Sequence, residues 1–234
     1  MVPVDQVAVV LPGAGSSADF VRRAFLAPLR AAGYALVAPQ PVPGADLVPA
    51  AFRSLDAAAA EHGPRLRLVG GVSLGAHTAA RWTAAARPDV DGVLLVLPAW
   101  TGAPGGMAAA TAASAGLVER LGTAGALAAA GTAVGWVAAE LTAAWPAYGD
   151  GLAPSLRAAA AAPGPTLAEL SALGVPAGLV AFPDDPLHPA AVAHEWAAAI
   201  PRAAVRELPL AAPAADRSIL GTTALAALTA ARLT

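Results

Sequence analysis

The sequence has no cysteine and no lysine, although it is 234 residues long. The absence of cysteine excludes thiol nucleophiles, zinc–thiolate sites and disulfides, and it is compatible with the cytoplasm, where we expect the protein. The absence of lysine excludes a Schiff base, a Ser–Lys dyad and a Walker phosphate loop. The 14 basic residues are all arginine, and with 16 acidic residues they give a net charge of −2. No basic field attracts phosphates, so nucleic acid is not an expected partner.

Charged and aromatic residues are scarce, and long apolar runs are nearly absent. Only 13% of the residues are charged and 5% are aromatic, while 57% are hydrophobic, which excludes intrinsic disorder. The only plausible membrane span, the uncharged stretch from Leu121 to Ala139, is mostly alanine, glycine and threonine, which insert poorly into a bilayer. The first residues carry Asp5 instead of the basic start of a signal peptide. We therefore expect no export signal and no membrane partner.

Short aliphatic runs alternate with longer alanine-rich segments along the chain. This alternation is typical of β-α units that build a parallel sheet buried on both faces. The predicted strands are residues 7–11, 34–38, 66–69, 92–97, 178–182 and 203–208, and the predicted helices are residues 18–32, 47–61, 74–86, 189–200 and 217–232. Asp216 is the expected N-cap of the last helix. The sequence thus predicts the α/β class, with a mostly parallel six-stranded sheet between two layers of helices.

The interval from about residue 100 to residue 173 breaks this alternation. It has no strand-like run and consists of alanine-rich helical sequence cut by Gly-Gly, Trp-Pro and Pro-Gly-Pro. We expect a helical cap at about residues 100–173, inserted into a single domain that spans residues 1–234.

A glycine-flanked serine follows the third predicted strand directly. Residues 71–75 read Gly-Val-Ser-Leu-Gly and lead into a predicted helix. At a strand-to-helix turn, flanking glycines let a strained backbone carry a serine over the sheet edge, with a helix N-terminus beneath it. Ser73 is therefore a candidate nucleophile, and an ordinary helix-capping serine is the alternative.

This arrangement resembles the α/β-hydrolase family over nearly the whole chain, in a small version that lacks the usual two leading strands. The resemblance implies a three-layer α/β-hydrolase fold with Ser73 as the nucleophile. It also implies an oxyanion hole formed by the N–H groups of Ala14, in the Gly-Ala-Gly loop after the first strand, and of Leu74, which follows the nucleophile. The spacing of that loop does not match the dinucleotide-binding fingerprint.

The loop after the fifth predicted strand resembles the acid loop of the family. Residues 182–189 read Phe-Pro-Asp-Asp-Pro-Leu-His-Pro, and Asp185 falls on the acid. The acid holds a histidine in the required tautomer and stabilises the imidazolium. Helix capping by Asp185, or by Asp184 beside it, is the alternative.

The base histidine of the family is missing from its usual loop. Residues 209–217, after the last strand, contain no histidine. This departure puts the activity in question, because a serine hydroxyl is a poor nucleophile unless a base takes its proton. His188 is the best-placed substitute, since its loop leaves the sheet at the same edge as Ser73, although a residue before proline could simply begin a helix.

The other candidate bases are weaker. His77 lies one helical turn after Ser73, so we expect it to pack or hydrogen-bond beneath the serine turn. His62 and His194 fall on helix surfaces that we expect to be solvated. Asp216 occupies the expected base region but would be a weak base at an ordinary carboxylate pKa.

Apolar side chains follow the fourth predicted strand and recur in the predicted cap. The expected pocket wall above the serine consists of Trp100, Met107, Trp136, Trp145 and Phe182. Each of these residues could instead pin the cap to the core. No arginine lies in the oxyanion loop or beside Asp185, so an uncharged substrate is favoured.

Two functions stay open at this point. The leading hypothesis is a serine hydrolase that cleaves a small uncharged carboxylic ester or thioester through an acyl-serine intermediate. The alternative is a non-catalytic protein of the same fold that binds a small apolar ligand, because the base histidine is missing from its usual loop. Neither requires a cofactor, and the four histidines lack the paired spacing of a metal site. The expected partner is a small molecule, and the sequence does not indicate the oligomeric state.

Overall fold

The computed structural model describes residues 6–86, 89–129 and 135–234, and its strands form a parallel sheet. The strand order is β2-β1-β3-β4-β5-β6. The strands are β1 (Gln6–Leu11), β2 (Tyr34–Val37), β3 (Leu66–Val72), β4 (Gly92–Val96), β5 (Ala177–Ala181) and β6 (Ala203–Glu207). Every predicted strand is confirmed. The third is longer than expected because Gly70, Gly71 and Val72 continue the pairing with β4.

The helices also follow the prediction closely. The described α-helices are α1 (Ala18–Ala31), α2 (Leu47–His62), α3 (Leu74–Ala86), α4 (Gly106–Ala129), α5 (Gly135–Ala144), α6 (Leu152–Ala161), α7 (Leu167–Ser171), α8 (Ala190–Ala199) and α9 (Ile219–Ala231). Short 3-10 helices are η1 (Gly63–Arg65), η2 (Trp145–Gly151) and η3 (Ala212–Ala214).

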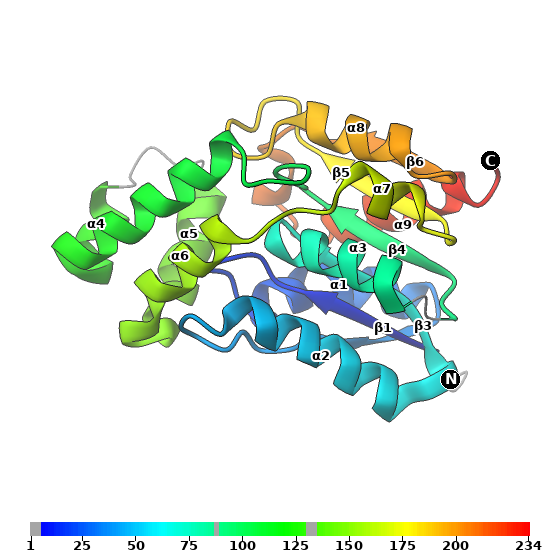
Figure 1. Ribbon diagram of the computed structural model, residues 1–234, viewed down its shortest axis with the longest axis horizontal. Coiled ribbons are helices and arrows are strands. Elements are labelled where there is room, and N and C mark those ends of the chain that lie inside the picture. The colour runs from blue at the N-terminus through cyan, green and yellow to red at the C-terminus, as the bar shows by residue number, and fades with distance from the viewer. Residues whose placement is uncertain (1–5, 87–88, 130–134) are drawn as a thin grey trace.

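Both faces of the sheet are covered by helices. Along β1, Val7 and Val9 pack on one face and Ala8 and Val10 on the other, as the two-residue period of a strand requires. Helices α2, α3, α7 and α8 contribute to the first face, and α1 and α9 to the second (Figure 1). The result is the predicted helix–sheet–helix arrangement.

Helices α4, α5 and α6 gather beside one end of the sheet (Figure 1). They share a cluster of buried side chains with the main body, in which Trp145 and Leu156 pack with Leu47 of α2 and Leu74 of α3. Helix α7 lies within the interval expected to form the cap, but its Leu170 belongs to the core on the sheet.

The long uncharged stretch from Leu121 to Ala139 is divided between α4 and α5. Residues 130–134 of this stretch lie outside the described residues. Within the described ranges, no helix combines the length and the apolar character needed to cross a membrane.

Two local expectations are wrong. Helix α9 begins at Ile219 and its N-cap position is Ser218, so Asp216 does not cap it directly; instead the Asp216 carboxylate accepts hydrogen bonds from the Ser218 N–H (2.8 Å) and hydroxyl (2.7 Å). The side chain of His62 is not on a solvated surface, since only 13% of it is exposed. It is the last residue of α2, where the chain turns at Gly63 with φ 50°.

Candidate active site

The turn between β3 and α3 has the strained geometry that its glycines allow. Ser73 has φ 53°, in the left-handed region that non-glycine residues rarely adopt. A Cβ on Gly71 would lie 2.2 Å from the carbonyl carbon of Gly75, and one on Gly75 would lie 2.5 Å from the Leu11 carbonyl oxygen. Only glycine therefore lets β3, α3 and the end of β1 approach this closely.

The structure brings Ser73, His188 and Asp185 together. The Ser73 Oγ lies 2.9 Å from His188 Nε2, and His188 Nδ1 lies 2.8 Å from Asp185 Oδ2. Because an ionised carboxylate only accepts hydrogen bonds, Nδ1 carries the ring proton and Nε2 is left to accept from the serine hydroxyl. The loop after β5 thus supplies both the acid and the histidine, which are separated by two residues.

Asp185 stays ionised although it is largely enclosed. Only 7% of its side chain is exposed. Burial disfavours the charged form, but hydrogen bonds from the His188 ring and from the Leu187 N–H (2.7 Å) more than offset this, and the pKa of Asp185 falls below its ordinary value. The carboxylate is therefore charged near neutral pH and able to stabilise an imidazolium.

The two N–H groups expected to form an oxyanion hole lie in the same region. Ala14 and Leu74 both line the cavity that contains Ser73. Neither backbone N–H donates a hydrogen bond to another described residue. The Gly13 position is close to the serine, since a Cβ there would lie 3.3 Å from Ser73 Cβ. The loop after β1 thus reaches the serine, with free donors at both positions.

His77 packs beneath this turn, as expected. It is 1% exposed, its Nε2 accepts a hydrogen bond from the Ala99 N–H (3.0 Å), and its ring meets the edge of Trp100 at 4.7 Å between centroids. Burial, with a smaller contribution from His188, lowers the pKa of His77 to about 3, so the ring is neutral. It supports the segment after β4 and does not reach Ser73 as a base.

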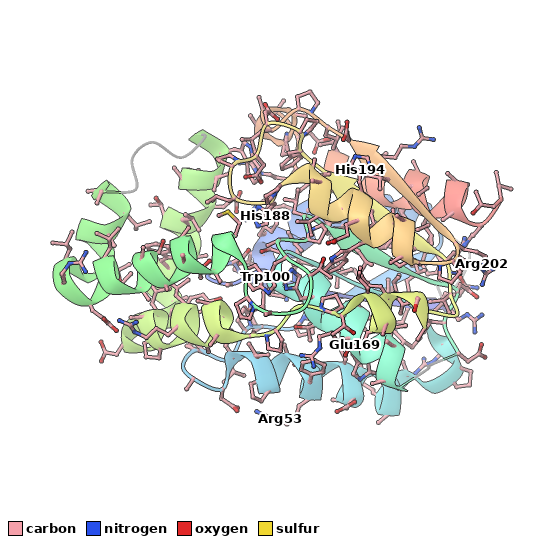
Figure 2. The ribbon with its side chains drawn as sticks, turned by 45° about the horizontal axis from the view of Figure 1, so that its top comes forward. Arg53, Trp100, Glu169, His188, His194 and Arg202 are labelled. Atoms are coloured by element: carbon pink, nitrogen blue, oxygen red, sulfur yellow. The ribbon has the colours of Figure 1, made fainter. Side chains whose placement is uncertain are left out.

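The other polar candidates lie away from the serine. His194 is on α8 with 57% of its side chain exposed, and its Nε2 lies 2.8 Å from Glu207 Oε1. Figure 2 shows His188 and Trp100 near the junction of α4–α6 with the sheet, and His194 further along α8. In the described part of the chain, no three histidine or acidic side chains gather as metal ligands would.

The loop after β6, where the family keeps its histidine, presents Leu210 to the cavity. The backbone N–H of Leu210 donates a hydrogen bond to Asp184 Oδ1 (3.0 Å), and the carbonyl of Leu210 accepts one from Trp136 Nε1 (2.7 Å). Asp184 therefore ties this loop to the acid loop instead of capping α8. Leu210 was not predicted as part of the pocket wall, because its place there depends on bonds to Trp136 and Asp184, which lie far from it along the chain.

A cavity of about 330 Å³ opens onto Ser73. All the side chains expected to form its wall line it, namely Trp100, Met107, Trp136, Trp145 and Phe182. Phe20, Leu97 and Glu140 line it as well and were not predicted. The apolar character of the wall is the predicted one, but several contributors come from elements that the sequence did not connect with the site.

Glu140 and Trp136 fasten α5 to the main body. The carboxylate of Glu140 is bonded to Arg23 of α1 and to Arg217 (3.0 Å), and the Arg217 guanidinium lies 5.1 Å from the centre of the Trp136 ring. Trp136 also stacks on Phe20 and meets Phe182 edge-on, each at 6.3 Å. We call this group the α5 clasp: Phe20, Arg23, Trp136, Glu140, Phe182 and Arg217.

Comparisons with known proteins agree on the architecture. No family model and no curated protein matches the chain by sequence. The structure is similar to MenH from S. aureus, with a TM-score of 0.73 and 14% identity over 97% of this chain and 95% of that one. It is also similar to the enol-lactonase from Burkholderia xenovorans LB400, with a TM-score of 0.71 and 17% identity over 96% and 91% of the two chains.

A third solved structure is MGS-M2, an α/β hydrolase enzyme from a Medee basin deep-sea metagenome library. The TM-score is 0.69 and the identity 11%, over 92% of this chain and 87% of that one. At these identities the similarity concerns the fold. With its parallel six-stranded sheet covered on both faces, the chain has the α/β-hydrolase fold.

Proposed function

We propose that this protein is a serine hydrolase that cleaves a small uncharged carboxylic ester or thioester. The observation that carries the proposal is the continuous hydrogen-bonded series from Ser73 through His188 to Asp185, at 2.9 and 2.8 Å. The first distance is within the range in which a histidine can take a serine proton, and the second is that of a hydrogen bond that orients the histidine ring. The solved structures include an enol-lactonase and esterases, which agrees with this reaction class.

In the first half-reaction, the Ser73 Oγ attacks the acyl carbon while its proton passes to His188 Nε2. Asp185 stabilises the imidazolium through Nδ1–H. The N–H groups of Ala14 and Leu74 donate to the oxygen of the tetrahedral intermediate, a contribution of about 3 kcal/mol per donor in enzymes of this kind. The imidazolium then gives its proton to the leaving alcohol or thiol, and acyl-Ser73 remains.

In the second half-reaction, water attacks the acyl-enzyme and His188 takes one of its protons. Collapse of the second tetrahedral intermediate releases the carboxylic acid and returns the proton to Ser73. We propose that α4, α5 and α6 act as a cap of the single domain, because their side chains line the cavity that contains Ser73.

The non-catalytic alternative depends on a serine without a base. The separation between Ser73 Oγ and His188 Nε2 removes the reason for preferring it. It becomes the working model if the serine proves unreactive.

A fluorophosphonate probe tests the proposal directly, with covalent labelling followed by intact mass. We expect rapid labelling of the wild-type protein, none of Ser73→Ala, and a rate at least about 10³-fold lower for His188→Ala. His194→Ala is the matched control, since it removes an exposed imidazole far from the serine, and it should label at the wild-type rate.

Two results would count against the proposal. Absence of labelling in the wild-type protein would overturn the activated serine. Equal labelling of wild type and His188→Ala would show that another group takes the proton. Hydrolysis of short ethyl esters, measured by titration of the released acid, then checks that labelling corresponds to turnover.

A further inference from the structure

The cavity is large for the smallest esters. Its volume is about 330 Å³, roughly twice that of an apolar protein cavity of about 150 Å³ that holds benzene. Its wall includes three indole rings and two phenyl rings, from Trp100, Trp136, Trp145, Phe20 and Phe182. Space and wall together suit a six-membered ring beside the ester group.

Most polar side chains of this wall are bonded to protein partners. The indole N–H of Trp100 donates to the Ala162 carbonyl (3.3 Å) and that of Trp136 to the Leu210 carbonyl (2.7 Å). The hydroxyls of Thr111 and Ser114 donate back along α4, to the carbonyls of Met107 (3.2 Å) and Ala110 (3.0 Å), respectively. The indole nitrogen of Trp145 is buried next to Gly15 and is the exception, since it has no hydrogen-bond partner among the described residues. Most donors along the wall are thus bonded within the protein, and a ligand finds mainly carbon surfaces there.

The wall also carries no free charge. Its carboxylate outside the catalytic group, Glu140, is bonded to Arg23 and Arg217. Among the described residues that line the cavity there is no arginine. A buried charge without a partner is costly. A substrate carboxylate would therefore lose its water without gaining a cation, and a substrate ammonium would find Glu140 already paired.

We propose that the site selects esters bearing a neutral, ring-sized apolar group, and that it rejects analogues with a charge on that group. This inference rests on the proposed hydrolase function and narrows its substrate class. Burial of a phenyl group favours the ring-bearing ester by roughly 10- to 100-fold in kcat/KM over the same ester without the ring.

A small set of esters tests this selection. Methyl phenylacetate and benzyl acetate carry the ring on the acyl and the alcohol side, respectively, and methyl acetate carries none. We expect at least one ring-bearing ester to exceed methyl acetate by about 10-fold or more. Ethyl hexanoate and monoethyl adipate differ by a carboxylate in place of a methyl group, and the charged ester should be at least about 30-fold poorer. Equal kcat/KM values within either comparison would overturn the inference.

A binding measurement separates this inference from the proposed function. With the Ser73→Ala protein, tryptophan fluorescence should report saturable binding of methyl phenylacetate and much weaker binding of the phenylacetate anion. If methyl phenylacetate binds, but the wild-type protein neither hydrolyses it nor reacts with the fluorophosphonate probe, the proposed hydrolase function is wrong and the inferred ligand class stands. If the probe labels the protein and methyl acetate is hydrolysed as well as the ring-bearing esters, the hydrolase function stands and the inferred ligand class is wrong.

A paired substitution on α4 locates the selection in the cavity. Ala110 lines the cavity, whereas the neighbouring Ala109 is exposed. Ala110→Leu should reduce the preference for the ring-bearing ester over methyl acetate by about 10-fold through loss of space. Ala109→Leu makes the same change on the same helix and should leave the preference unchanged. The inference fails if the two variants behave alike.

Discussion

At the scale of single residues, the serine turn depends on the absence of side chains at its flanks. A Cβ on Gly71 would lie 2.2 Å from the Gly75 carbonyl carbon, so Gly71→Ala forces the end of β3 away from the start of α3. This substitution should lower the free energy of unfolding by about 3 kcal/mol and abolish labelling of Ser73. Thermal unfolding and probe labelling measure the two effects. Gly174→Ala is the control, since no atom lies within 4 Å of a Cβ there. Similar melting temperatures for the two variants would contradict this account.

The neutral buried ring of His77 makes stability depend on pH. Its pKa is lowered from 6.5 to about 3 in the folded protein, so between these values the unfolded chain binds the extra proton. The contribution of the neutral His77 ring to the free energy of unfolding is fully present above about pH 6.5. It is lost as the pH falls below that value, by up to about 1.4 kcal/mol per pH unit. Urea unfolding between pH 7.5 and pH 5 should show a steeper loss for wild type than for His77→Gln. Parallel curves would show that this ring does not carry the effect.

At the scale of elements, the α5 clasp holds the cavity wall in place. Glu140 and Arg217 are each about one-seventh exposed, at 14% and 16%, so removing the charge of Glu140 leaves a guanidinium without its main partner. Glu140→Gln should lower the free energy of unfolding by about 3 kcal/mol and make the α5 region easier to cleave by protease. Asp19→Asn breaks an exposed pair with Arg22 and should change neither property measurably. Equal effects of the two substitutions would show that the clasp does not stabilise α5.

The elements that sequence predicts well are those encoded by local patterns. Each strand run, each alanine-rich helix and the Gly-x-Ser-x-Gly turn lies within a short segment of the sequence. The structure contains all of these predicted elements. Leu210 and Glu140 were not predicted because their significance comes from partners far along the chain, such as Trp136 for Leu210 and Arg217 for Glu140. The position of His188 could be suggested by the shared sheet edge, but its distance to Ser73 required the folded loop.

At the scale of the whole molecule, one buried cluster joins the α4–α6 region to the main body. It combines Leu47 of α2 and Leu74 of α3 with Trp145, Tyr148 and Leu156. We therefore expect one cooperative transition in urea, with coincident curves from tryptophan fluorescence and far-ultraviolet circular dichroism. Separate midpoints would show that the α4–α6 region unfolds on its own and that the single-domain proposal is wrong.

The loop after β5 carries both partners of the serine within four residues, from Asp185 to His188. Under the proposed mechanism, one short segment therefore carries both the acid and the histidine that act on the serine proton. In the α/β-hydrolase family these two groups lie on two different loops. In this mechanism the loop after β6 carries no catalytic group, and its Leu210 lines the cavity. Natural variation or directed randomisation of residues 209–213 can thus retune which substrates fit while leaving the chemistry intact, so the two properties can evolve separately.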